Sequence, residues 1–150
     1  MSLIAKILPP ANVLCDLDAA GKDQLFEAVA RLFAANQQIP HKKVHDSLAA
    51  REKLGSTGLG QGIAIPHGRI KGLREATGAF VKLKVPIPFD GPDGRPVGLL
   101  FILLVPEQAT DLHLQILGEL AQMFSDRHLR DNLQASVDPA EIHRLLVEWS

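Results

Sequence analysis

The sequence predicts a single α/β domain of α+β-like character, spanning residues 1–150, in which helices flank one mixed β-sheet of about five strands. Residues 97–105 form an almost wholly apolar run between two prolines, as expected of a strand buried on both faces. Stretches with helical spacing of apolar residues lie on both sides of it. Strands separated by helices favour a partly parallel sheet.

The N-terminal part of the chain predicts one strand followed by a helix. Residues 13–17 follow the proline pair at positions 9 and 10 and form a short strand candidate. A helix then begins near Gly21 and ends between Asn36 and Pro40. Its apolar residues recur along one face, at Leu25, Phe26, Val29, Ala30, Leu32 and Phe33.

A second helix is predicted over residues 41–54, with Val44, Leu48 and Leu54 facing inward and Gly55 as the stop signal. Residues 55–62 read as a glycine-rich loop, and a short apolar stretch follows at residues 63–65.

The remaining strands and helices follow from alternation, prolines and capping residues. Residues 77–83 alternate as a strand with one covered face does, and the proline-rich residues 86–96 form a loop or hairpin connection. Thr110 is the expected N-cap of a helix that runs to about Phe124. Two short helices complete the chain, one over residues 126–135 and one opened by Asp138 and Pro139.

Composition excludes several classes of protein. The 16 Lys and Arg residues nearly balance the 17 Asp and Glu residues, and like charges form no long run, so the chain lacks the footprint of a nucleic-acid-binding protein. No stretch approaches the ~18 apolar residues of a membrane span, and the first ten residues do not read as a signal peptide. We expect a cytoplasmic protein, consistent with a single cysteine, Cys15, which we expect to be buried.

Residues 51–68 carry the chemistry. The glycines at 55, 58, 60 and 62 allow sharp turns, and backbone N–H groups there, with the Ser56 and Thr57 hydroxyls, are a candidate anion site. We define Ser56, Thr57, Gly58, Gly60 and Gly62 as the predicted phosphate-binding loop. The stretch is not a nucleotide loop, because it lacks Gly-Lys-Ser/Thr and the G-x-G-x-x-G spacing, and it precedes a strand instead of following one.

His67 is the candidate phosphoryl acceptor, since a neutral imidazole is nucleophilic near pH 7. Phosphorylation would add roughly two negative charges, which Arg51 is placed to bind. His113, in the first turn of its helix, is a second candidate. Spacing alone leaves other readings open: a lone histidine in a turn is commonly structural, and His113 shares a stripe with core residues.

Two further histidines raise the question of a metal. His41 and His45 lie four residues apart on a predicted helix, but the Glu of H-E-x-x-H is missing. We interpret them as part of a solvated face and predict neither a metal nor a cofactor.

Taken together, residues 51–68, ending in Ile-Ala-Ile-Pro-His-Gly, resemble the IIA domains of the phosphoenolpyruvate-dependent phosphotransferase system, of the fructose/mannitol and nitrogen-regulatory type. The resemblance continues through residues 86–107 and 113–117. It implies that His67 accepts a phosphoryl group from an HPr-like carrier protein, that Arg51 and His113 line the site, and that Nε2 is the modified atom.

Within that family the sequence is more similar to the nitrogen-regulatory branch. Phe89 and Asp90 fit that branch, whereas Gly98 departs from it by replacing a common acidic residue. The resemblance implies a protein that regulates target proteins by its phosphorylation state. From the apolar residues around His67 we expect partners to dock near Leu59, Ile63 and Ile70. Two alternatives remain: a sugar-specific IIA that passes phosphate to a IIB protein, and a binding module without phosphotransfer.

Overall fold

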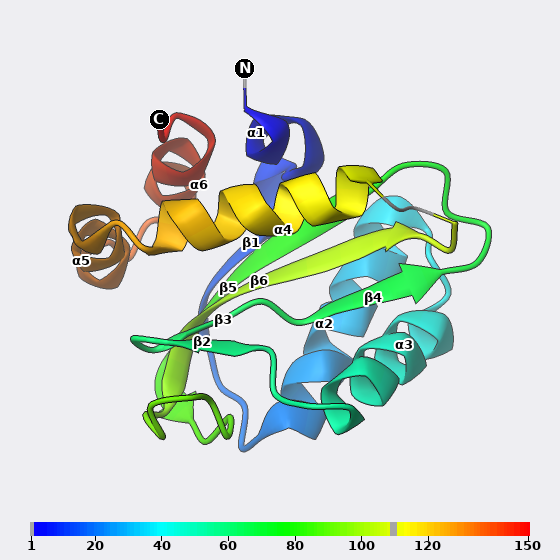
Figure 1. Cartoon of the computed structure of the whole chain (residues 1–150), viewed down its shortest axis with the longest axis horizontal. Coiled ribbons are helices and arrows are strands. Elements are labelled where there is room, and N and C mark those ends of the chain that lie inside the picture. The colour runs from blue at the N-terminus through cyan, green and yellow to red at the C-terminus, as the bar shows by residue number, and fades with distance from the viewer. Residues whose placement is uncertain (1, 109–110) are drawn as a thin grey trace.

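The computed structural model describes residues 2–108 and 111–150, and it contains a six-stranded sheet between two layers of helices (Figure 1). The strands are β1 (Val13–Leu17), β2 (Gly58–Gly60), β3 (Ile63–Ala64), β4 (His67–Ile70), β5 (Thr77–Ile87) and β6 (Val97–Pro106). The helices are α1 (Leu3–Ile7), the 3₁₀ turn η1 (Pro10–Asn12), α2 (Lys22–Gln37), α3 (His41–Lys53), α4 (Asp111–Phe124), α5 (Arg127–Ala135) and α6 (Pro139–Val147).

The sheet is mixed, as predicted. Its order is β1-β5-β6-β3-β2, and β4 also pairs with β6, beyond β3 along the same edge. β5 and β6 are antiparallel, whereas β1 is parallel to β5, and β3 and β4 are parallel to β6.

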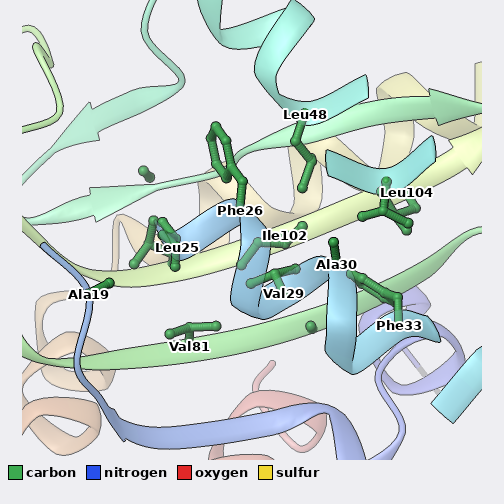
Figure 2. Packing of buried hydrophobic residues seen from close by; sticks show 14 of the residues in the cluster. Ala19, Leu25, Phe26, Val29, Ala30, Phe33, Leu48, Val81, Ile102 and Leu104 are labelled. Atoms are coloured by element: carbon green, nitrogen blue, oxygen red, sulfur yellow. The ribbon is translucent and has the colours of Figure 1, made fainter. Parts of the chain in front are cut away.

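Strand β6 separates two hydrophobic cores. Leu100, Ile102 and Leu104 point into the core beneath α2 and α3, where Figure 2 shows Ile102 and Leu104 near Phe26 and Phe33 of α2. The alternate residues Leu99, Phe101, Leu103 and Val105 point into the core beneath α1, α4, α5 and α6. This period of two explains why the whole strand is apolar.

The caps of the last two helices follow the predicted chemistry. The Asp126 carboxylate accepts hydrogen bonds from the backbone N–H groups of His128 and Leu129 and so caps α5. Asp138 accepts from the Ala140 N–H, with Pro139 at the first position of α6. Trp149, near the C-terminus, donates its indole N–H to Asp126 over 2.9 Å, which ties the chain end to the start of α5.

Several details differ from the sequence-based predictions. Leu54 is 85% exposed and does not face inward, because α3 ends before it. Helix α1 and strand β4 were not predicted. Cys15 is only partly buried. Strand β5 continues past residue 83 to Ile87, and Pro86 is tolerated because the pairing with β6 is irregular between Lys82 and Ile87.

The predicted N-cap Thr110 lies outside the described residues. None of the helices within residues 2–108 and 111–150 combines the length and apolar character needed to cross a bilayer.

The packing of β5 on β6 gives a test of the core. A Cβ added at Gly78 would lie 2.6 Å from Cε1 of the fully buried Phe101 ring. We expect Gly78→Ala to lower the free energy of unfolding by about 1–3 kcal/mol, measured by chemical denaturation. Gly118→Ala on α4, where no heavy atom lies within 4 Å, is the matched control and should stabilise by about 0.5–1 kcal/mol. Equal stabilities for the two variants would contradict this packing.

Candidate functional site

His67 is the first residue of β4 and lies at the edge of a shallow hollow. Strand β6 holds the backbone here, since the Leu103 N–H donates to the Pro66 carbonyl over 2.9 Å and His67 itself pairs with Leu103. The side chain is partly buried. The strand that the sequence predicts before this histidine is β3, and the histidine also begins a further strand, β4, which was not predicted.

The two ring nitrogens of His67 have different partners. Nδ1 lies 2.9 Å from the Ile65 carbonyl oxygen, which can only accept, so Nδ1 carries the hydrogen. Nε2 lies 3.3 Å from Arg51 Nε, which donates to it. In the neutral ring Nε2 therefore holds the lone pair. This is the tautomer in which Nε2 is the nucleophilic atom.

Arg51 is held against the histidine by the end of its own helix. It lies in the last turn of α3, and its Nη1 donates to the Gly55 carbonyl over 2.8 Å. The guanidinium is thus fixed at two nitrogens, with its Nε directed at the imidazole.

The surroundings keep His67 neutral. Burial is the largest cause that lowers the pKa of His67 below its usual value of 6.5, and the positive charge of Arg51 lowers it further. The hydrogen bond to the Ile65 carbonyl and the charge of Glu52 act in the opposite direction without cancelling the shift.

His113 packs against His67 from the first turn of α4. The two ring centroids are 5.6 Å apart and the rings meet edge to face at 65°. His113 is 9% exposed, and its Nε2 has no hydrogen-bond partner among the described residues. Burial, then the neighbouring His67 and Arg69, lower the pKa of His113. His113 is thus buried, as the core-facing interpretation predicts, and it also contacts His67, while its catalytic role stays a prediction.

The predicted phosphate-binding loop is only partly at the site. Ser56, Thr57 and Gly58 line a hollow of about 360 Å³ together with Arg51 and His67, and α4 closes its other side with Leu117, Gly118 and Ala121. The Ser56 hydroxyl donates to the Phe89 carbonyl and the Thr57 hydroxyl to Glu52, so both hydroxyl hydrogens already have acceptors.

Gly60 and Gly62 lie outside this hollow. Gly60 is the last residue of β2, and Gly62 is the second residue of the two-residue turn between β2 and β3. Gln61 and Gly62 in this turn both have positive φ, 58° and 78°, as a type I′ hairpin requires. Their role in the structure is to shape this turn.

The expected docking residues are corrected in the same region. Ile63 and Ile70 are 1% and 3% exposed and belong to the two cores, whereas Leu59 is 44% exposed at the hollow. Leu114, one turn before Leu117 on α4, is 67% exposed and extends the apolar rim.

His41 and His45 face carboxylates of α2. His41 Nε2 lies 2.7 Å from Glu27, and His45 Nε2 lies 2.8 Å from Asp23. Within residues 2–108 and 111–150, no three histidine, cysteine or acidic side chains are grouped so as to hold a metal ion.

Sequence reasoning missed two charged residues beside the site, Glu52 and Lys22. Glu52 follows Arg51 directly, and its side chain is 6% exposed and paired with Lys22 over 2.9 Å. For Glu52, the signal in the sequence was its position inside residues 51–68. For Lys22 there was no signal, because it lies 30 residues away from Glu52 in the chain.

Comparison with known proteins assigns the chain to a family. The family described as "Phosphoenolpyruvate-dependent sugar phosphotransferase system, EIIA 2" matches residues 6–149. A nitrogen regulatory protein of Pseudomonas aeruginosa is 38% identical over 151 residues, covering 99% of this chain and 97% of that protein. The crystal structure of nitrogen regulatory protein IIA-Ntr from Neisseria meningitidis superposes with a TM-score of 0.91 at 48% identity, covering 97% of this chain and 99% of that one.

A fructose-specific EIIA component of Haloferax volcanii is also similar, at 35% identity over 103 residues, 69% of this chain and 67% of that protein. The fold and the matches together define a protein of the phosphotransferase system. The chain belongs to the EIIA 2 family of that system, and the two relatives described first, both matched along nearly their whole length, are nitrogen regulatory proteins.

The environments of His67 and His45 predict opposite titrations. NMR titration should give His67 a pKa below 6.5, with the hydrogen on Nδ1 in the neutral form. His45, whose pKa is raised chiefly by its hydrogen bond to Asp23, should titrate above 6.5 and serves as the internal control. Similar pKa values for the two rings would contradict the geometry.

These shifts have opposite consequences for stability. Since folding lowers the pKa of His67, the unfolded chain binds more protons as the pH falls through about 6.5, and the contribution of His67 to stability decreases there. The contribution of His45 is present below about 6.5 and is lost as the pH rises through its raised pKa.

Proposed function

We propose that this chain is a phosphoryl carrier that accepts a phosphoryl group on Nε2 of His67 from an HPr-like carrier protein and regulates target proteins by its phosphorylation state. The observation that carries the proposal is the fixed tautomer of His67: the Ile65 carbonyl holds Nδ1–H, and the lone pair on Nε2 faces the hollow-lining Arg51.

The transfer step is a displacement at phosphorus. The Nε2 lone pair of His67 forms the new N–P bond as the bond between phosphorus and the donor atom breaks, and the donor atom leaves with its electron pair. The hydrogen stays on Nδ1 throughout, where it is hydrogen-bonded to the Ile65 carbonyl oxygen. The imidazole needs no deprotonation because its pKa is lowered by burial, so the neutral form dominates at pH 7.

Two groups next to His67 are suited to the negative charge that arrives. The Arg51 Nε–H, which donates to Nε2 in the free protein, would be released to donate to a phosphoryl oxygen. His113 Nε2 is buried and has no partner among the described residues, so a phosphoryl oxygen would satisfy it. Together they supply donors from both α3 and α4.

The shape of the hollow favours a protein as the donor. It is open and shallow, and Leu59 and Leu117 line it beside Arg51 and His67. The exposed Leu114, one turn before Leu117 on α4, extends this apolar rim by helical spacing. A small nucleotide would find no enclosing walls, whereas a protein surface can cover such a rim and exclude water during transfer.

The regulatory role rests on the relatives. Proteins named nitrogen regulatory protein match this chain at 38% identity over nearly its whole length, and a nitrogen-regulatory IIA structure matches at 48%. A phosphoryl group inside an apolar rim alters which protein surfaces can dock, because it places a dianion where an uncharged imidazole was. We infer a cytoplasmic location from the same relationship.

The second candidate function is a fructose-type IIA that passes phosphate to a IIB protein during sugar uptake. The match to a fructose-specific EIIA component supports this second candidate. The two functions share the chemistry at His67 and differ in the acceptor.

Phosphorylation of His67 can be tested by mass spectrometry. Incubation with phosphoenolpyruvate, enzyme I and an HPr-like carrier should add about 80 Da, the mass of one phosphoryl group. His67→Gln should abolish the gain, and His128→Gln, an exposed position on α5, should leave it intact. No gain in the wild-type protein, or a gain that persists in His67→Gln, would favour a binding module without this phosphotransfer.

The choice between the regulatory and the sugar-uptake function can be tested by measuring transfer of the phosphoryl group from this chain to IIB proteins. We expect protein labelled on His67 to transfer little label to fructose- or mannitol-type IIB proteins, because its role is to hold the group. A fructose-specific IIA serves as the positive control. Transfer from this chain at the rate of that control would overturn the regulatory assignment in favour of sugar uptake.

A further inference from the structure

An ion pair with a buried carboxylate lies directly behind the proposed phosphoryl-acceptor site. The Glu52 side chain is 6% exposed and that of its partner Lys22 is 26% exposed, and both carboxylate oxygens accept hydrogen bonds. Oε1 accepts from the Thr57 hydroxyl over 2.7 Å, while Oε2 accepts from the Thr57 backbone N–H over 3.1 Å and from Lys22 Nζ over 2.9 Å. The Glu52 carboxylate, in the last turn of α3, thus binds Thr57 and fixes the turn that follows the helix.

Lys22 connects this turn to two other parts of the fold. It is the first residue of α2, and its Nζ lies 4.5 Å from the centre of the Phe89 ring and 3.9 Å from Asp90. The Phe89 carbonyl in turn accepts from the Ser56 hydroxyl. The ion pair is therefore the point where α2, α3, the turn at residues 55–57 and the segment after β5 meet.

A continuous series of hydrogen bonds leads from this pair to both reactive groups. The Thr57 carbonyl accepts from the Ile65 N–H over 3.0 Å, and the Ile65 carbonyl holds His67 Nδ1. On the other side of the same turn, the Gly55 carbonyl holds Arg51 Nη1. The turn that Glu52 fixes thus sets the tautomer of His67 and the direction of the Arg51 guanidinium.

We propose that Glu52 and Lys22 are positioning residues for phosphoryl transfer. They hold the turn at residues 55–57 so that Arg51 Nε lies within hydrogen-bonding distance of His67 Nε2. This inference rests on the proposed function. A buried ion pair is often no better for stability than an apolar pair of the same volume, so its hydrogen-bonding geometry is the feature to test.

Glu52→Gln is the informative variant, because an amide has one oxygen for the three donors that the carboxylate accepts. On the Oε2 side its NH₂ group would face two donors, Lys22 Nζ and the Thr57 N–H, and on the Oε1 side it would require the Thr57 hydroxyl to accept instead of donate. We expect kcat for phosphorylation of His67 to fall about 10- to 100-fold with KM for the carrier within about twofold, since a displaced reactive group costs rate more than binding. Glu75→Gln, an exposed carboxylate on the turn before β5, is the charge-matched control.

Three variants that change Lys22 and one of Thr57 separate positioning from stability. The double variant Lys22→Met/Glu52→Gln removes both charges of the pair, so it should recover stability relative to Lys22→Met alone while kcat stays low. Lys22→Arg keeps the cation and should retain kcat within about threefold. Thr57→Val removes only the hydroxyl and should lower kcat less than Glu52→Gln does.

The geometry can also be measured without any phosphorylation. In the unphosphorylated wild-type protein, NMR should show the single Nδ1–H tautomer of His67 and a slowly exchanging Arg51 Nε–H. In Glu52→Gln we expect mixed tautomers and faster exchange. Wild-type kcat and unchanged NMR signals in Glu52→Gln and in the double variant would overturn the positioning role. If the wild-type protein accepted no phosphoryl group, the proposed function would fail while these NMR signals still decided the role of Glu52.

Discussion

The burial of strand β6 on both faces is the constraint on which the rest of the structure depends. Its alternating side chains contribute to two separate cores, one beneath α2 and α3 and one beneath α1, α4, α5 and α6 (Figure 1). Its backbone is also paired on both edges, with β5 on one side and with β3 and β4 on the other. A strand so placed needs apolar residues at every position and partners for every N–H and C=O. The two helix layers cover its side chains, and the neighbouring strands pair with its backbone.

This arrangement explains where the site forms. The edge of β6 beyond β3 accepts the short strand β4, whose first residue is His67, opposite Leu103. α4 follows β6 in the chain and crosses the same edge, so its first turn brings His113 to His67. Helix α3 packs beside β4 on the other face and delivers Arg51 from its last turn. Three elements that each cover β6 therefore meet around one imidazole.

The difference between what the sequence predicted and what the structure contains follows from this dependence on distant partners. Local periodicity and capping predicted α2, α3, α5, α6 and β6, because their residues carry the signal themselves. β4 was missed because His-Gly-Arg-Ile has no alternating pattern, and only the available edge of β6 makes it a strand. At the site, Arg51, His67 and His113 were chosen by chemistry and are brought together. Lys22 was beyond reach, because nothing local links it to Glu52, and the Ser56 and Thr57 hydroxyls could not be seen to be engaged by Phe89 and Glu52.

The electrostatics of the site also bear on how a single domain could signal two states. Around the hollow, Arg51 supplies one positive charge while burial favours the neutral forms of His67 and His113. Under the proposed function a phosphoryl group adds roughly −1.5 to −2 charges, so the local sign reverses from positive to negative. The apolar rim formed by Leu59, Leu114 and Leu117 stays the same in both states, and it would supply contact area to partners of either kind. Because screening limits the reach of this charge to about 8–10 Å at physiological salt, only partners that dock directly on the rim can distinguish the two states. Selectivity between partners would therefore come from the charge that a partner places opposite His67, and overall affinity from the apolar contacts around it.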